Sequence, residues 1–210
     1  MDGKEVGILL FDNIEVLDFC GPFEVFSVTR LNEEKRREES SPFRVFLVAE
    51  TKELIVTTGG MRVLPDFNLN DCPKLDVLVV PGGLGTRKEM NNESLLKWIA
   101  DRSRQVEVLT SVCTGSLLLG KAGLLDGKRA TTHWRALEWM QELFPKTTVE
   151  KELHVVEEGS LFTSAGISAG IDMALKVVRY FFGEAVARAT AKYMEYPFPE
   201  SNARRIVLEP

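Results

Sequence analysis

The segment "VEVLTSVCTGSLLLGKAGLL" (106–125) changes from strand-like to helix-like sequence at Cys113, with almost no residues left for a loop. The residues before Cys113 are apolar and rich in β-branched side chains, which is typical of a buried strand. Those after Gly115 are rich in leucine, which is typical of a helix. A strand that passes directly into a helix is a unit of α/β folds, in which helices cover a sheet.

The rest of the chain repeats this alternation of short apolar blocks and helical periodicity. Strands are predicted over 5–11, 43–50, 75–83 and 106–112, with hairpins around Gly59-Gly60 and over 153–164. Helices are predicted over 21–29, 92–105, 132–144 and 170–182. Continuously apolar strands separated by helices predict a mostly parallel sheet with helices on both faces. The length fits one well-buried domain, so we expect a single domain over residues 1–210.

Composition and charge exclude several classes of protein. The net charge is -5 and no basic stripe occurs, which argues against nucleic-acid binding. The mixed charge run at 32–41 predicts a solvated loop or a frayed helix end. Three cysteines do not make a disulfide framework, and the first apolar stretch is too short to span a membrane and lacks a basic leader. We therefore expect a cytoplasmic protein with reduced thiols and no membrane partner.

Cys113 lies where ligands bind in open α/β sheets, beyond the carboxyl end of a strand. The short junction predicts a sparsely populated backbone conformation at Cys113, which costs about 1–3 kcal/mol, and Gly115 avoids a collision as the helix turns away. The N–H groups of that helix are expected to lower the thiol pKa and make Cys113 a nucleophile. The alternative is an inert cysteine that fills a small gap, which is also the role expected for Cys20 and Cys72.

Two other segments are predicted to complete this site. Backbone N–H groups of Gly83, which ends a neighbouring strand, and of Thr114 are candidates for an oxyanion hole. Asp18 has two interpretations: an N-cap for a helix that begins near Gly21-Pro22, or a carboxyl group close to the thiol. In the second interpretation Asp18 or Cys113 must hold a proton, because a carboxylate and a thiolate repel each other in a dry pocket.

The two histidines give weaker signals. His133 precedes a predicted helix and is a candidate for the edge of the pocket, whereas His154 is predicted on the surface of a strand. Neither supports a Cys-His-Asp triad on the sequence alone. No cluster of His, Cys and carboxylate residues has the spacing of metal ligands, so no metal site is predicted.

Four segments together resemble the ThiJ/PfpI superfamily, which is related to class I glutamine amidotransferase domains. They are "LDFCGPFEVF" (17–26), "LDVLVVPGG" (75–83), "SVCTGSLLLGKAGLLDGKRATTHW" (111–134) and "SAGISAGIDMAL" (164–175). Within the superfamily the chain is most similar to bacterial isocyanide hydratases. The block from "VCTG" to "ATTHW" also occurs in the sensor domains of AraC-type transcription regulators. The resemblance implies a flavodoxin-like three-layer α/β sandwich with a cysteine nucleophile elbow, in a homodimer.

The resemblance also implies roles for individual residues. Cys113 matches the nucleophile and Asp18 its acidic partner. Thr114 stands where the protease-like branch has a histidine, which argues against peptidase activity. Gly83, Thr114, His133 and Ile167 are implied to line the oxyanion hole and the substrate site.

The implied activity is hydration of an isocyanide, a small-molecule substrate, to an N-substituted formamide through a covalent thioimidate on Cys113. This is a lyase reaction that needs no metal or organic cofactor. The alternatives are a glyoxalase or deglycase activity, a peptidase or amidase, and a non-catalytic domain that senses a ligand or redox state. A regulator that binds DNA directly would need a further helix-turn-helix region of about 100 residues, which we do not expect in a chain that ends at Pro210.

Overall fold

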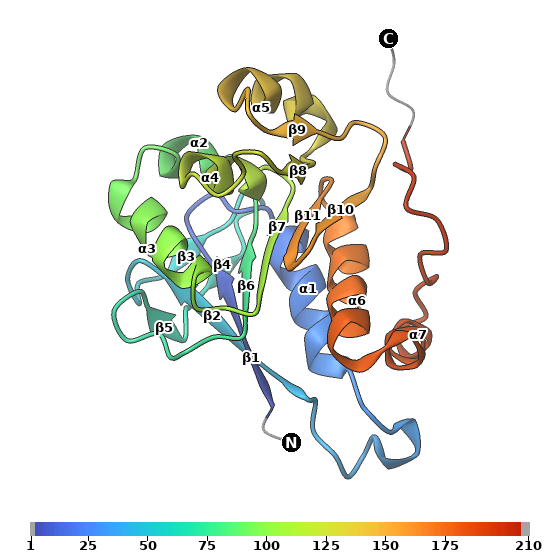
Figure 1. The fold of residues 1–210 in the computed structure, drawn as a ribbon. Coiled ribbons are helices and arrows are strands. Elements are labelled where there is room, and N and C mark those ends of the chain that lie inside the picture. Colours follow the sequence, from blue (N-terminus) through green and yellow to red (C-terminus); the bar gives the residue numbers. More distant parts are fainter. Residues whose placement is uncertain (1–2, 207–210) are drawn as a thin grey trace.

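The computed structural model describes residues 3–206, which form a seven-stranded sheet in the order β10-β11-β7-β6-β1-β2-β5 (Figure 1). The strands are β1 (Lys4–Leu9), β2 (Phe43–Ala49), β5 (Phe67–Asn68), β6 (Val77–Val80), β7 (Val108–Val112), β10 (Val155–Glu158) and β11 (Leu161–Ser164). Only β10 runs antiparallel to its neighbour, so the predicted mostly parallel sheet is confirmed.

The centre of the sheet is buried on both faces, and its strands are mostly apolar. Every residue of β6 and β7 is buried, and the two strands pair in parallel from Val77 opposite Val108 to Val80 opposite Ser111. Both strands therefore end at the same edge of the sheet. The residues that follow them, 81–83 and 113–115, come together at that edge.

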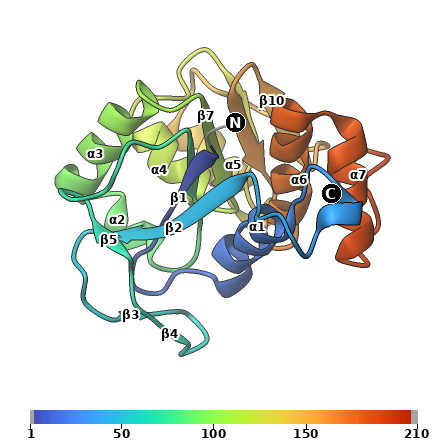
Figure 2. The same ribbon diagram turned by 90° about the horizontal axis from the view of Figure 1, so that it is seen from below.

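Helices cover both faces, so the molecule has three layers, as the resemblance implied. The helices are α1 (Val16–Val28), α2 (Thr86–Glu89), α3 (Glu93–Ser103), α4 (Gly115–Lys121), α5 (Leu137–Leu143), α6 (Ala169–Phe182) and α7 (Glu184–Tyr193). Figure 2 shows α2, α3 and α4 on one side of the sheet and α1, α6 and α7 on the other. None of the helices within residues 3–206 has the length and apolar character needed to cross a bilayer.

Short elements complete the described chain. The predicted hairpin around Gly59-Gly60 is formed by β3 (Ile55–Val56) and β4 (Arg62–Val63), and a second small sheet pairs β8 (Arg129–Ala130) with β9 (Thr148–Val149). Two 3-10 turns, η1 (Glu33–Lys35) and η2 (Trp134–Ala136), precede β2 and α5.

Helix α1 begins at Val16, so the predicted start near Gly21 is wrong. Gly21 and Pro22 lie inside the helix, although an internal proline removes one backbone hydrogen bond. Phe19, Val25 and Phe26 of α1 are buried, and this packing outweighs the local preference of proline for a helix start.

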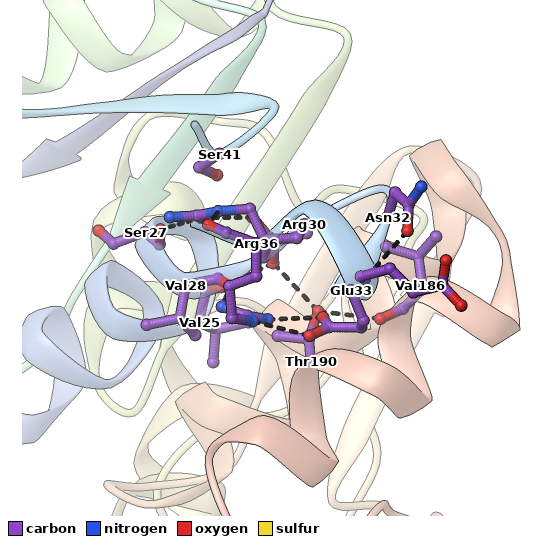
Figure 3. Close-up of polar contacts among 12 residues, drawn as sticks. Val25, Ser27, Val28, Arg30, Asn32, Glu33, Arg36, Ser41, Val186 and Thr190 are labelled. Atoms are coloured by element: carbon purple, nitrogen blue, oxygen red, sulfur yellow. Dashed lines mark hydrogen bonds and ion pairs between the residues drawn. The ribbon is translucent and has the colours of Figure 1, made fainter. Parts of the chain in front are cut away.

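The mixed charge run forms a mostly exposed loop between α1 and β2, as predicted, but Arg36 holds it through polar contacts (Figure 3). The Arg36 guanidinium forms an ion pair with Glu33 and donates to the carbonyl oxygen of Val28 at 2.6 Å. It also lies 3.5 Å from the ring centre of Tyr193 on α7. The loop is therefore held by contacts from both helices.

Candidate active site

Cys113 lies at the carboxyl end of β7 with φ 56°, which confirms the predicted sparsely populated backbone conformation. Thr114 is the N-cap of α4 and Gly115 is the first residue of that helix. A Cβ atom on Gly115 would lie 2.0 Å from the carbonyl oxygen of Val80, so the predicted need for a small residue is also confirmed. The absence of a side chain at Gly115 lets α4 start directly against the end of β6.

Replacing Gly115 by alanine should therefore destabilise the protein. The Cβ would collide with rigid backbone atoms, and overpacking of this kind costs about 1–3 kcal/mol. Urea unfolding of Gly115→Ala compared with Gly59→Ala measures this, because a Cβ on Gly59 meets nothing within 4 Å. Equal midpoints for the two variants would contradict the prediction.

Asp18 reaches the same point from α1, on another layer. Its side chain is fully buried, and Oδ2 accepts a hydrogen bond from the Gly82 N–H at 2.9 Å. Oδ1 is buried without a conventional partner in residues 3–206, and the Cys113 thiol lies within interaction range of the carboxyl group. Glu15 is the N-cap of α1, so the N-cap interpretation of Asp18 is wrong.

Burial raises the pKa of Asp18 to about 8, and the Gly82 N–H only partly opposes this effect. The charge of Glu15 raises the pKa of Asp18 further. At neutral pH the Asp18 carboxyl group is therefore mostly protonated. This agrees with the expectation that one member of the Asp18–Cys113 pair holds a proton.

The predicted low pKa of the Cys113 thiol is wrong. Cys113 is only 6% exposed, and this burial raises its pKa, as does the negative charge that Asp18 carries when it is ionised. The N–H and hydroxyl of Thr114 lower the thiol pKa but do not outweigh burial. The dipole of α4 has little weight against this burial, because the helix has only seven residues. The resting site thus holds a thiol beside a carboxylic acid.

Thr114 connects the elbow to the end of β6. The Gly83 N–H donates to Thr114 Oγ1 at 3.0 Å, and the buried Thr86 hydroxyl lies 3.1 Å from the same oxygen. The Gly83 N–H is therefore engaged by Thr114 and does not serve as the predicted free oxyanion donor.

Gly82 is the residue of the "PGG" segment that sequence analysis missed. It supplies the N–H that binds Asp18, and a Cβ on it would lie 2.5 Å from the Thr114 nitrogen. The glycine pair was visible in the sequence, but only the turn geometry distinguishes its two members.

His133 and Ile167 lie together on the wall of a cavity of about 230 Å³. Cys113 is not among the described residues that line it, but its backbone is bonded to this wall. The Cys113 N–H donates to the carbonyl oxygen of Ala165, a lining residue, at 3.2 Å, and Thr132 Oγ1 donates to the Cys113 carbonyl oxygen at 3.0 Å. Burial lowers the pKa of His133, and the charges of nearby arginines lower it further.

The remaining candidates have clear positions. His154 is buried, with Nε2 3.1 Å from Oδ2 of Asp172, so its predicted place on the strand surface is wrong. Cys72 is buried and Cys20 is partly buried, and burial raises the pKa of both thiols. Within residues 3–206, no three His, Cys, Asp or Glu side chains are grouped in a way that would hold a metal ion.

Comparison with known proteins places this geometry in context. The model of the DJ-1/PfpI family matches residues 4–180. The isonitrile hydratase of Pseudomonas putida is 38% identical over 194 residues, which cover 91% of this chain and 78% of that protein. The crystal structure of a ThiJ/PfpI family protein from Pseudomonas syringae superposes with a TM-score of 0.82 and 29% identity, over 96% of this chain and 79% of that one.

A second group of relatives consists of transcription regulators. The HTH-type transcriptional regulator CdhR of Pseudomonas aeruginosa is 31% identical over 184 residues, which cover 88% of this chain. The matched region is 52% of that regulator, so the chain spans about half the length of the regulators it matches.

Proposed function

This chain belongs to the DJ-1/PfpI family, and from this premise we propose that it hydrates isocyanides to N-substituted formamides with Cys113 as the nucleophile. The observation that carries the proposal is the buried Cys113 thiol beside the protonated Asp18 carboxyl group, at the end of a strained strand-to-helix junction. The similarity to an isonitrile hydratase over most of both chains supports the choice of substrate. A homodimer in the cytoplasm is part of the same proposal and follows from the family resemblance.

The first half of the reaction adds the thiol across the terminal isocyanide carbon. The sulfur of Cys113 forms a bond to that carbon, while the Asp18 carboxylic acid delivers a proton to it. The thiol proton returns to the Asp18 carboxylate, so R–N≡C and the thiol give the thioimidate R–N=CH–S–Cys113. Because the thiol is protonated at rest, its proton leaves through Asp18 during the attack, and no thiolate has to form beforehand.

The second half returns the enzyme to its starting state. The Asp18 carboxylic acid gives its proton to the thioimidate nitrogen, and the carboxylate so formed takes a proton from the water molecule that attacks the thioimidate carbon. Collapse of the tetrahedral intermediate breaks the carbon–sulfur bond and releases R–NH–CHO with the thiol restored. The sum is R–N≡C + H₂O → R–NH–CHO. In this proposal the Thr114 hydroxyl, which accepts a hydrogen bond from the Gly83 N–H, orients the water or the acid.

A ligand sensor is the second candidate, because transcription regulators match most of this chain. In that function the cavity beside the elbow would bind a ligand without converting it. Glyoxalase, deglycase and amidase activities would keep Cys113 as the nucleophile but use a carbonyl substrate.

Incubation of the purified protein with cyclohexyl isocyanide separates these candidates. We expect formamide in large molar excess over protein, with matching loss of the N≡C infrared stretch. Methylglyoxal is tested beside it on the same preparation and should be consumed far more slowly. Tight binding of the isocyanide without any formamide would favour a sensor and contradict hydration.

A further inference from the structure

The cavity beside the elbow is lined by two arginines from the C-terminal segment and by the residues that precede α6. It has a volume of about 230 Å³, and its lining includes Arg204, Arg205, His154 and Ser168. Since a water molecule in the liquid takes about 30 Å³, this volume suits a ligand of a few non-hydrogen atoms. The Cys113 N–H donates to the carbonyl oxygen of Ala165, which lines the cavity, so the backbone of the elbow is bonded to the cavity wall.

Arg204 gives the cavity a positive charge that forms no direct ion pair within residues 3–206, although the negative charge of Glu152 acts on it. The side chain is half-buried and donates only to neutral oxygens: Lys151 O at 2.6 Å, Thr131 Oγ1 at 2.8 Å and Thr132 O at 3.2 Å. No Asp or Glu oxygen of residues 3–206 lies within 4.0 Å of its nitrogens, whereas Arg205 pairs with Asp172 at 2.5 Å. A half-buried guanidinium without a directly paired carboxylate favours the binding of an anion.

The backbone before α6 adds unused hydrogen-bond donors. Gly166, Ile167 and Ser168 all line the cavity, and their amide N–H groups find no acceptor in the described part of the chain. Ile167 has φ 31°, which curves this segment, and the 14-residue helix α6 begins immediately after Ser168. Successive N–H groups on a curved segment at a helix N-terminus are a common binding element for anions.

His154 is an independent sign that the cavity is built for a polar ligand. Its side chain lines the cavity although the residue is only 6% exposed, and no atom of residues 3–206 forms a hydrogen bond with Nδ1. Buried polar groups in proteins nearly always have a partner. A ligand in the cavity, or water that accompanies it, would supply one.

We propose that this cavity binds the carboxylate group of a small organic acid through Arg204 and the 166–168 amides. Together with the proposed function, on which this further step rests, the substrate is an isocyanide that carries a carboxylate. Isocyanoacetate is the simplest compound of this class, and its hydration gives N-formylglycinate.

Binding of N-formylglycinate to the wild-type protein tests the cavity without relying on turnover. By calorimetry it should bind at least about tenfold more tightly than its uncharged methyl ester, since a charged hydrogen bond is lost in the ester. Ser168→Asp places a competing carboxylate in the cavity and should remove this preference. Ser168→Asn, of nearly equal size, should retain it. Both residues are good N-caps, so α6 is expected to fold in either variant.

Other measurements identify the group that is recognised. Arg204→Gln should lose the preference, whereas Arg104→Gln, in an exposed arginine that follows α3, should not. Equal binding of the acid and its ester by the wild-type protein would overturn the inference. Inorganic phosphate that binds as tightly as N-formylglycinate would overturn the assignment to a carboxylate.

The catalytic arm compares isocyanoacetate with methyl isocyanoacetate. The ratio of their kcat/KM values should be at least about tenfold in favour of the acid, and this ratio should be lower in Ser168→Asp than in Ser168→Asn. Equal rates for the two compounds would overturn the inference and leave the proposed hydration intact. If neither compound is hydrated, the proposed function fails, and the binding measurements still decide whether the cavity takes a carboxylate.

Discussion

Cys113→Ala should reduce formamide production from an isocyanide by at least about 1,000-fold, because removing the nucleophile of a covalent mechanism removes its main reaction path. The variant should still fold, since alanine deletes one sulfur atom and keeps the backbone that α4 and β7 require. Initial rates of formamide formation, followed by proton NMR, measure the loss. Near-ultraviolet circular dichroism of the same samples reports on the fold.

The other two cysteines provide the matched controls for this experiment. Cys72→Ala and Cys20→Ala remove thiols that take no part in the proposed chemistry, and they should retain the wild-type rate within a few-fold. Intact-mass spectrometry with a slowly hydrolysed isocyanide should detect one adduct on the wild type and none on Cys113→Ala. A Cys113→Ala protein with wild-type turnover would rule out the thioimidate route.

Asp18→Asn should stabilise the protein at alkaline pH. The folded-state pKa of Asp18 is about 8 and its ordinary value is 3.8, so between these values the folded protein binds the proton that the unfolded chain releases. The contribution of this bound proton to the free energy of unfolding is complete below pH 3.8. It is lost as the pH rises through about 8. The difference of about four pKa units corresponds to a free energy on the order of 5 kcal/mol.

An asparagine cannot ionise and avoids this loss. The free energy of unfolding of Asp18→Asn should therefore exceed that of the wild type at pH 9, and the two should converge near pH 4. Urea unfolding at a series of pH values measures the difference. The same variant should lose most of its formamide production, because an amide cannot pass protons between the thiol and the substrate.

Asp172→Asn is the control, because its effect on the free energy of unfolding should have the opposite sign. Burial opposes ionisation of Asp172, but hydrogen bonds with His154 and Tyr196 and the charge of Arg205 together hold its pKa below the ordinary range. Its ionised form thus contributes stability above the unfolded-state pKa, and this contribution is lost as pH falls through the lowered pKa. Asp172→Asn should be destabilised at neutral pH, and a gain in stability there would contradict the assignment.

The strand-to-helix junction was predictable because its evidence is local. The change of periodicity at Cys113, the glycine two residues later and the glycines after β6 all follow from hydrophobic pattern and steric requirements. The positive φ of Cys113 and the close approach of Gly115 to Val80 were expected for the same reason. Adjacent parallel strands then bring their carboxyl ends together without further information.

The misjudged features depend on tertiary structure. The start of α1 was misplaced because packing of its apolar residues overrides the local signal of Pro22. The thiol pKa was expected to fall because the helix dipole is visible in the sequence, whereas burial of Cys113 under α1 and beside Asp18 is not. The cavity joins Arg204, His154 and Ser168, which no sequence motif connects.

Both edges of the large sheet offer only a short stretch of backbone to a further strand. Just before β10, the chain at 202–204 pairs with this edge: the His154 N–H donates to Asn202 O, and Leu153 forms a bridge with Ala203. At the other edge, β5 has only two residues. Unpaired edges are the usual template for intermolecular β-pairing and amyloid growth. The covered start of β10 and the shortness of β5 therefore leave little edge backbone for pairing between copies of the chain.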